Sequence, residues 1–244
     1  MQVRLLILAA IVAYTPVVFG APASSDWRYQ LTPYIWMPSV AGDIRPTSSS
    51  PTFSSSMSFS DVWNDLDGAF FLNATARRDR FVIFGDLTYA DLSDSASLLP
   101  GVKIKGNVRQ TAATALAGYQ VVDEPTYSVD LMGGARFWRT RAEVEVPLLG
   151  LKDSETERWT DPIVAARLRS EFTPRWSSIV YADVGGFGVG SRSTWQFVGS
   201  VNYHLEQSVH LSAGYRHLEV DYRDGGMRLD VKLSGPLLGA TWQF

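Results

Sequence analysis

The amino-acid sequence predicts an all-β fold, an antiparallel up-and-down transmembrane β-barrel. Three observations predict it. Apolar and polar residues alternate along most of the chain, as they do along strands whose two faces differ. Tight turns and longer polar segments separate these runs in alternation, which is typical of barrels with short turns on one rim and longer loops on the other. After the N-terminal segment no run of about 18 apolar residues occurs, which excludes spanning helices.

The N-terminal segment is predicted to be a cleavable secretory signal peptide. Arg4 provides the positive start, Leu5 to Phe19 forms an apolar run, and Ala21-Pro22-Ala23 fits a peptidase cleavage site. An uncleaved membrane anchor is the alternative, but it needs about 20 apolar residues and this run is shorter and holds a proline. We therefore expect a signal peptide over 1–23 and a single barrel domain over 24–244.

The totals exclude several function classes. Lys and Arg number 22 and Asp and Glu 25, so no basic field favours a nucleic-acid partner. The absence of cysteine excludes disulfides, thiolate catalysis and cysteine zinc sites. A hydrophobic content of 45% and a mean hydropathy of -0.03 resemble a soluble protein. Alternation dilutes apolar content in a barrel, however, so these values exclude only a helical membrane protein.

The alternation predicts ten strands. In the run from Trp195 to Leu205, for example, Trp195, Phe197 and Tyr203 fall on one face, and polar residues fall on the other. Eight or twelve strands stay open, because two loop-side connections, near Gly190 to Ser193 and Arg223 to Gly226, are short. The predicted strands are 27–38, 69–79, 80–93, 103–121, 126–143, 159–172, 175–190, 193–206, 208–224 and 227–244.

Three connections are predicted to be long loops: Ser39 to Gly68, Ser93 to Val102 and Val144 to Arg158. The first contains a Ser- and Pro-rich run and then a short segment in which Ser60 is expected to cap a single helical turn. This turn either lies over the loop rim as part of a surface loop or folds into the lumen as a partial plug. The charged segment from Lys152 to Arg158 is a candidate surface for adhesion or interaction, although such runs are usually only solvated.

The last strand places its charge where a membrane tolerates it. Its outward residues run from Trp242 back to Ser234, and Lys232 then lies about 30 Å along the membrane normal, above an apolar band of about 25 Å. Aromatic residues gather near the strand ends and predict two girdles. A soluble barrel or sandwich is the alternative, but its apolar faces would point inward. The girdle residues are Trp27, Tyr29, Phe81, Phe172, Trp176, Trp242 and Phe244 at one level and Tyr89, Trp159, Trp195 and Tyr222 at the other.

The faces opposite the apolar residues are expected to line the lumen. Their charges are of mixed sign, so we expect them to pair with one another and largely fill a narrow interior. The alternative is a narrow pore in which Arg136, Arg167 and Arg216 favour anionic or polar solutes. The predicted polar network consists of Asp86, Asp130, Arg136, Arg167, Arg169, Glu171, Asp183 and Arg216; Asn73, Gln110, Asn202, His204 and Glu219 are placed on the same face.

Catalytic groupings can be drawn but are weak. Ser212 lies two residues from His210, and His217 is near Glu219 and Asp221. Such groupings arise easily in a polar lumen, and no motif of a barrel hydrolase occurs, so we expect no enzyme. A lipid or peptide hydrolase is kept as an alternative. The histidines also lack metal-ligand spacing.

The C-terminal part of the chain carries a resemblance. It ends in Trp242-Gln243-Phe244, preceded by the runs Gly214-Tyr215-Arg216, Asp221 to Gly226 and Ser234 to Gly239. With the export signal and paired strands, this resembles a small bacterial outer-membrane β-barrel protein, akin to the OmpW and opacity-type groups. The resemblance implies that Trp242 and Phe244 form the signal read by the outer-membrane assembly machinery.

The sequence therefore predicts a non-enzymatic integral outer-membrane barrel, either structural or a narrow passive channel for small polar or anionic solutes. Its expected partners are outer-membrane lipid and lipopolysaccharide and the assembly machinery. We expect a monomer with no cofactor, no metal and no nucleic-acid partner.

Overall fold

The computed structural model describes residues 26–45, 52–99, 102–146, 151–224 and 227–244. The predicted signal peptide lies outside the described residues and stays a prediction. The elements are β1 (Arg28–Trp36), β2 (Ser39–Arg45), β3 (Phe53–Met57), α1 (Phe59–Asn64), β4 (Leu66–Arg78), β5 (Phe81–Leu99), β6 (Val102–Asp123), β7 (Tyr127–Val146), β8 (Leu151–Thr173), β9 (Trp176–Gly185), β10 (Ser193–His204), β11 (Val209–Asp224) and β12 (Met227–Gln243).

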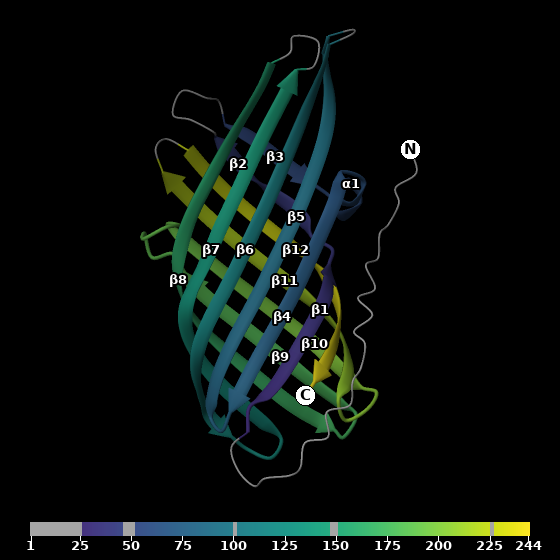
Figure 1. The fold of residues 1–244 in the computed structure, drawn as a ribbon, viewed down its shortest axis with the longest axis vertical. Helices are drawn as coiled ribbons and strands as arrows, with labels where there is room; N and C mark the ends of the chain where they lie inside the picture. Colours follow the sequence, from purple (N-terminus) through teal and green to yellow (C-terminus); the bar gives the residue numbers. More distant parts are fainter. Residues whose placement is uncertain (1–25, 46–51, 100–101, 147–150, 225–226) are drawn as a thin grey trace.

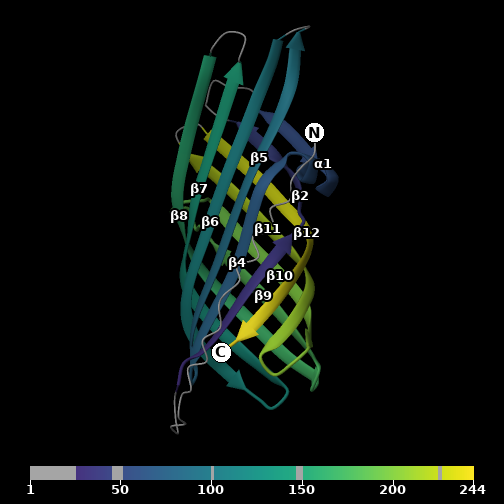
Figure 2. The same ribbon diagram turned by 45° about the vertical axis from the view of Figure 1, so that its right-hand side comes forward.

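Ten strands, β1 and β4 to β12, form a closed antiparallel barrel (Figure 1). From β4 onward each strand pairs with the next along the chain, and β1 closes the ring between β4 and β12. Leu31 marks this closure, because it lies opposite Ala74 on one side and Trp242 on the other. Figure 2 shows β1 beside β12, which runs down to the C-terminus at the end of the tight turns. The predicted ten-stranded up-and-down barrel is confirmed.

The segment predicted as the first long loop, Ser39 to Gly68, begins with a hairpin. β2 continues the line of β1 along β12, and β3 folds back onto β2. The predicted helical turn is present as α1, beside this hairpin at the rim (Figure 1). Its N-cap is Ser58, whose hydroxyl accepts from the backbone N–H of Asp61, so the prediction of Ser60 as the cap is wrong. Because α1 lies at the rim, it does not plug the lumen.

Strands β5 to β8 are longer than predicted. The segments Ser93 to Val102 and Val144 to Arg158 were expected to be loops, but β5, β6, β7 and β8 continue through most of both. In both views these four strands rise above the others at the end opposite the C-terminus (Figures 1 and 2). Outside a bilayer both faces of a strand can be polar, and the alternation that marks a strand then fades. The sequence of these strand extensions therefore predicts loops instead of strands.

The outer face carries the apolar residues. On β11, Leu211, Ala213 and Tyr215 are exposed, whereas the residues between them face the lumen. An aromatic girdle surrounds the tight-turn end, where the rings of Tyr29 and Phe244 stack with centroids 5.8 Å apart. Among the described residues, no helix has the length and apolar character to cross a membrane.

The second predicted girdle is only partly present. Trp195 points outward and is 41% exposed, but Trp159 and Tyr222 are only 7% and 3% exposed because they point into the lumen. Their assignment to the girdle is therefore wrong. Trp159 is two residues from the lumen residue Asp161, and Tyr222 is six residues from the lumen residue Arg216. Because residues an even number apart on a strand share a face, both rings point inward.

Candidate functional site

The lumen near the tight turns holds two arginines around one aspartate. Asp130 on β7 accepts hydrogen bonds of 2.7 and 2.9 Å from Arg77 Nη2 on β4 and one of 3.0 Å from Arg167 Nε on β8. Arg77 also donates to Gln120 and Arg167 to Thr75, and all five side chains are buried. β4 is not a neighbour of β7 or β8, so this lower cluster crosses the lumen.

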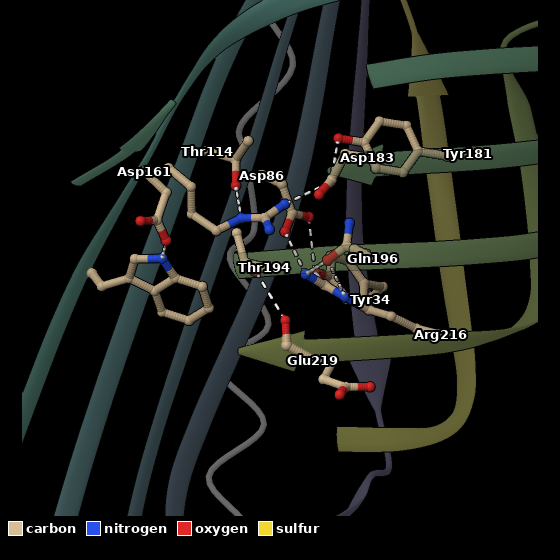
Figure 3. Close-up of polar contacts among 12 residues, drawn as sticks. Tyr34, Asp86, Thr114, Asp161, Tyr181, Asp183, Thr194, Gln196, Arg216 and Glu219 are labelled. Atoms are coloured by element: carbon tan, nitrogen blue, oxygen red, sulfur yellow. Dashed lines mark hydrogen bonds and ion pairs between the residues drawn. The ribbon is translucent and has the colours of Figure 1, made fainter. Parts of the chain in front are cut away.

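A second group is centred on Arg216 of β11. Its Nη2 lies 3.1 Å from Oδ1 of Asp86 on β5, and it also donates to Gln196. The Tyr34 hydroxyl joins the pair, because it accepts from Arg216 Nη1 and donates to Asp86 Oδ2 at 2.9 Å (Figure 3). The guanidinium also lies 4.6 Å from the ring centroid of Trp36, which is cation–π range. Four strands thus meet in this Arg216 cluster.

A third group, the Arg136 cluster, lies beside it. Arg136 Nη2 on β7 is 2.6 Å from Oδ2 of Asp183 on β9, and its Nε donates to Thr114 on β6 (Figure 3). Tyr181 donates to the same Asp183 oxygen at 2.7 Å. The ring of Tyr181 stacks across the lumen on Phe84 of β5, with centroids 5.2 Å apart. Polar and aromatic contacts together fill the middle of the barrel.

An aromatic stack occupies the lumen toward the long strands. Trp159 lies between Trp138 and Tyr222, with ring centroids 5.6 and 4.1 Å apart. The Trp138 indole N–H donates to Asp161, and that of Trp159 donates to Ser191. Because Trp159 and Tyr222 come from β8 and β11, this upper stack also bridges strands that are not neighbours.

Two adjoining cavities lie among these groups in the part of the chain that the structure describes. One of about 130 Å³ is bounded by residues of the lower cluster and the Arg216 cluster. The other, of about 330 Å³, lies at the tight-turn end and is bordered by Arg28, Arg77 and Arg169. Both are lined by Gln30 and Thr75, so they adjoin. Open space in the lumen therefore continues from the tight-turn end to the Arg216 cluster.

The structure brings together six of the eight charged residues predicted for the lumen network and leaves two apart. Arg169 is partly buried and donates to Ser128 at 3.3 Å beside the larger cavity. Glu171 is exposed near the end of β8 and makes no side-chain bond among the described residues. Trp242 and Phe244 lie on the outer face at the tight-turn end. The six paired residues are Asp86, Asp130, Arg136, Arg167, Asp183 and Arg216.

The predicted histidine groupings are only partly present, because His217 Nε2 lies 3.7 Å from Glu219 Oε2 whereas Ser212 does not bond to His210. His204 and His210 lie in the lumen with ring centroids 5.1 Å apart, and His217 lies on the outer face. Ser212 donates to Asn202 at 2.7 Å instead of to His210. No three acidic or histidine side chains in the described part of the chain could hold a metal ion together.

The placement of Glu219 in the lumen is wrong. Glu219 shares its face of β11 with Tyr215, which points toward lipid. Figure 3 shows the Glu219 carboxylate directed away from the interior clusters, while its backbone carbonyl accepts from Thr194. The same period of two that places Arg216 inward places Glu219 outward.

Sequence reasoning missed the uncharged members of the clusters. Tyr34, Tyr181 and Gln196 hydrogen-bond to the buried ions, but none of them is among the lumen residues that the sequence predicts. Their position relative to charged residues is the signal that could have found them, since Tyr181 precedes Asp183 by two residues.

Comparison with known proteins finds relatives in structure alone. No family model matches the sequence, and no curated protein does either. The outer membrane protease OmpT from Escherichia coli has a TM-score of 0.59 at 9% identity, over 91% of this chain and 99% of that one. The translocator domain of the autotransporter NalP from Neisseria meningitidis has a TM-score of 0.49 at 13% identity, over 92% and 90% of the two chains.

These identities establish a likeness of fold and nothing about activity. The closed barrel has an apolar outer face and an aromatic girdle, which are the features of a lipid-embedded barrel. OmpT, whose fold this chain shares, is an outer membrane protease. The chain thus has the fold of an outer-membrane β-barrel protein.

Proposed function

We propose that the protein is a structural outer-membrane barrel whose lumen is closed by its own side chains. One observation carries this proposal: buried side chains join non-neighbouring strands at three levels, in the lower cluster, the Arg216 cluster and the upper stack. A solute passing through would have to separate buried ion pairs. Removing one partner from such a pair costs about 3 to 5 kcal/mol, which is a large barrier for passive passage.

The charge pattern also favours a filled lumen over a selective pore. A selectivity ring presents unpaired groups of one sign to the solute. Arg136, Arg167 and Arg216 instead each contact a buried carboxylate at 2.6 to 3.1 Å. The charges of Arg136 and Arg216 are therefore neutralised within the lumen, and Arg167 shares the carboxylate of Asp130 with Arg77.

The remaining expectations belong to this proposal. We propose a monomer in contact with outer-membrane lipid and lipopolysaccharide, assembled through its C-terminal aromatic residues and lacking catalysis in the lumen. The likeness to the OmpW and opacity-type groups is part of the proposal and is supported by the closing hairpin of β11 and β12.

Electrical recording tests the closed lumen. The protein is refolded, its heat-modifiable migration on denaturing gels is checked, and it is inserted into planar bilayers beside a known porin as a positive control. We expect no single-channel openings from the folded protein. Regular openings that scale with the amount of folded protein would contradict the proposal.

Slow passage of small anions is a second candidate, favoured by one feature. Arg28, Arg77 and Arg169 border the cavity at the tight-turn end, and Asp130 is the carboxylate bonded to Arg77 there. The mouth therefore carries excess positive charge. If openings are recorded, this candidate predicts a reversal potential that reports anion selectivity, and Arg169→Gln should weaken that selectivity.

A further inference from the structure

The outer face of the barrel carries a chemical grouping that is separate from the lumen. Ser234 on β12 and His217 and Glu219 on β11 share the lipid-facing side of their strands. Ser234 Oγ lies 2.5 Å from His217 Nδ1, and His217 Nε2 lies 3.7 Å from Glu219 Oε2. A hydroxyl, an imidazole and a carboxylate therefore lie in a row, the arrangement that activates a serine as a nucleophile.

The fold fixes this row. Ser234 and His217 are direct partners in the ladder between β11 and β12, and Glu219 follows His217 on the same face. The ring of Trp195 on β10 packs on the imidazole with centroids 4.5 Å apart and limits its movement. The side chains of His217 and Glu219 are 24% and 28% exposed, so a molecule beside the barrel can reach them.

The height of the row matches an ester linkage in a lipid. The ten residue-to-residue steps from Phe244 back to Ser234 rise about 25 Å at 3.3 Å per residue and a tilt near 40°, which is about the height of the apolar band. Below Ser234 the outward residues of β12 include Pro236 and Leu238, whereas Lys232 and Asp230 follow above it. The row thus lies at the level where the outer surface of the barrel changes from apolar to charged. Acyl esters of membrane lipids lie at this boundary between hydrocarbon and headgroups.

We propose that Ser234 and His217 form a catalytic site that cleaves an acyl ester of a membrane lipid, with Glu219 as the positioning residue. Ser234 Oγ attacks the ester carbonyl carbon while its proton passes to His217 Nδ1. The bond between that carbon and the lipid alcohol oxygen breaks, and His217 returns the proton to the departing alkoxide. Water, deprotonated by the same imidazole, then attacks the acyl-serine, releases the fatty acid and restores the hydroxyl.

Two side chains support the step. The Glu219 carboxylate faces the far nitrogen of His217, so it favours the tautomer with the proton on Nε2 and stabilises the imidazolium that forms. Backbone N–H groups of a barrel wall are engaged in the ladder, so positive charge near the oxyanion has to come from a side chain. Lys232 is the next outward residue on β12, and its ammonium lies 3.3 Å from Glu219.

This site is independent of the closed lumen, because its side chains lie on the other side of the wall. A conducting barrel would leave the proposed hydrolysis untouched, and an inactive outer face would leave the closed lumen untouched.

The test measures fatty-acid release by the full-length folded barrel. The protein is reconstituted into vesicles of glycerophospholipid alone or of glycerophospholipid with lipid A, and released fatty acids and residual lipids are measured by mass spectrometry. A fluorophosphonate probe is applied in parallel, followed by peptide mapping. We expect labelling at Ser234 and release from at least one lipid. Which lipid loses acyl chains identifies the source of the ester.

Matched variants make the result specific. Ser234→Ala and His217→Ala should lower release by about 1,000-fold or more, as for other catalytic nucleophile and base pairs. Glu219→Gln should lower it too, and Glu219→Asp should restore part of it. Ser178→Ala changes a serine on the lipid-facing side of β9, and His204→Ala changes a lumen histidine, so both should keep full release.

Heat-modifiable migration confirms that each variant is folded. No release from either lipid by the folded wild-type protein, or release that persists in folded Ser234→Ala, would overturn the proposal.

Discussion

Arg216 Nη2 lies 3.1 Å from Asp86 Oδ1, although the two residues belong to β11 and β5 on facing sides of the barrel. The exposed fractions of their side chains are only 4% and 9%. The pair therefore connects facing sides of the wall through the lumen, and its loss should lower the stability of the whole barrel. Such buried pairs across the lumen also distinguish a filled barrel from a porin-like one.

Removing one residue of this ion pair should destabilise the barrel strongly. Arg216→Met leaves the Asp86 carboxylate buried without its cation, so we expect a loss of about 3 to 5 kcal/mol in the free energy of unfolding, measured by urea titration in detergent micelles. Arg109→Met is the matched control, because its partner Asp91 lies on the outer face and the arginine is 45% exposed. That change should cost less than about 1 kcal/mol. Equal losses in the two variants would contradict the role of burial.

The upper stack should be equally sensitive to a change at its centre. Trp159→Ala removes the ring that contacts both Trp138 and Tyr222, so we expect a loss of about 3 to 5 kcal/mol in unfolding free energy. Trp195→Ala, which removes an outward indole, should cost clearly less because lipid or detergent replaces the lost contacts. Intrinsic tryptophan fluorescence during urea unfolding provides the measurement. A smaller loss for Trp159→Ala than for Trp195→Ala would refute the lumen position of the stack.

Much of this architecture could be predicted because side chains along a barrel strand alternate between two environments, lipid outside and the polar lumen inside. The alternation that put Leu131 toward lipid put Asp130 and Arg136 toward the lumen, and the structure places them so. The tight turns could be predicted for the same reason, since each interrupts the alternation only briefly. The ends of β5 to β8 could not be predicted, because strands outside the bilayer have no apolar face to mark them.

The sequence does not predict which lumen residues contact one another. Period two shows which residues face inward, but not that Arg216 meets Asp86 and Arg136 meets Asp183, because those contacts depend on the curvature of the whole ring. The outer row was missed for another reason. His217 and Glu219 are two residues apart in the sequence, but Ser234 is brought beside them only by the register of β11 with β12.

The C-terminal residue should matter more for assembly than for the finished barrel. Phe244 pairs with Tyr29 through two backbone bonds of 2.8 and 3.0 Å and through ring stacking. Phe244→Ala keeps the backbone bonds, so we expect the refolded barrel to lose no more than about 1 kcal/mol. In cells, the heat-modifiable fraction in the outer membrane should fall several-fold, because the terminal aromatic is the expected assembly signal. A normal outer-membrane fraction in cells would remove that role from Phe244.

The cap of α1 should respond to acid. The Asp61 carboxylate accepts from the backbone N–H of Ser58 at 2.9 Å and from its hydroxyl at 2.7 Å, and these hydrogen bonds hold the pKa of Asp61 below its ordinary value of 3.8. A carboxyl whose folded pKa is depressed stabilises the helix fully above the unfolded pKa and loses this effect as pH falls through the folded pKa. Protection of the Val62 and Asp65 amides, which bond within α1, should therefore stay level from neutral pH down to about 5 and fall below about 4. Hydrogen exchange corrected for intrinsic rates measures this protection. Asp61→Asn should show lower protection with no acid step, and a step of equal size in that variant would contradict the assignment to Asp61.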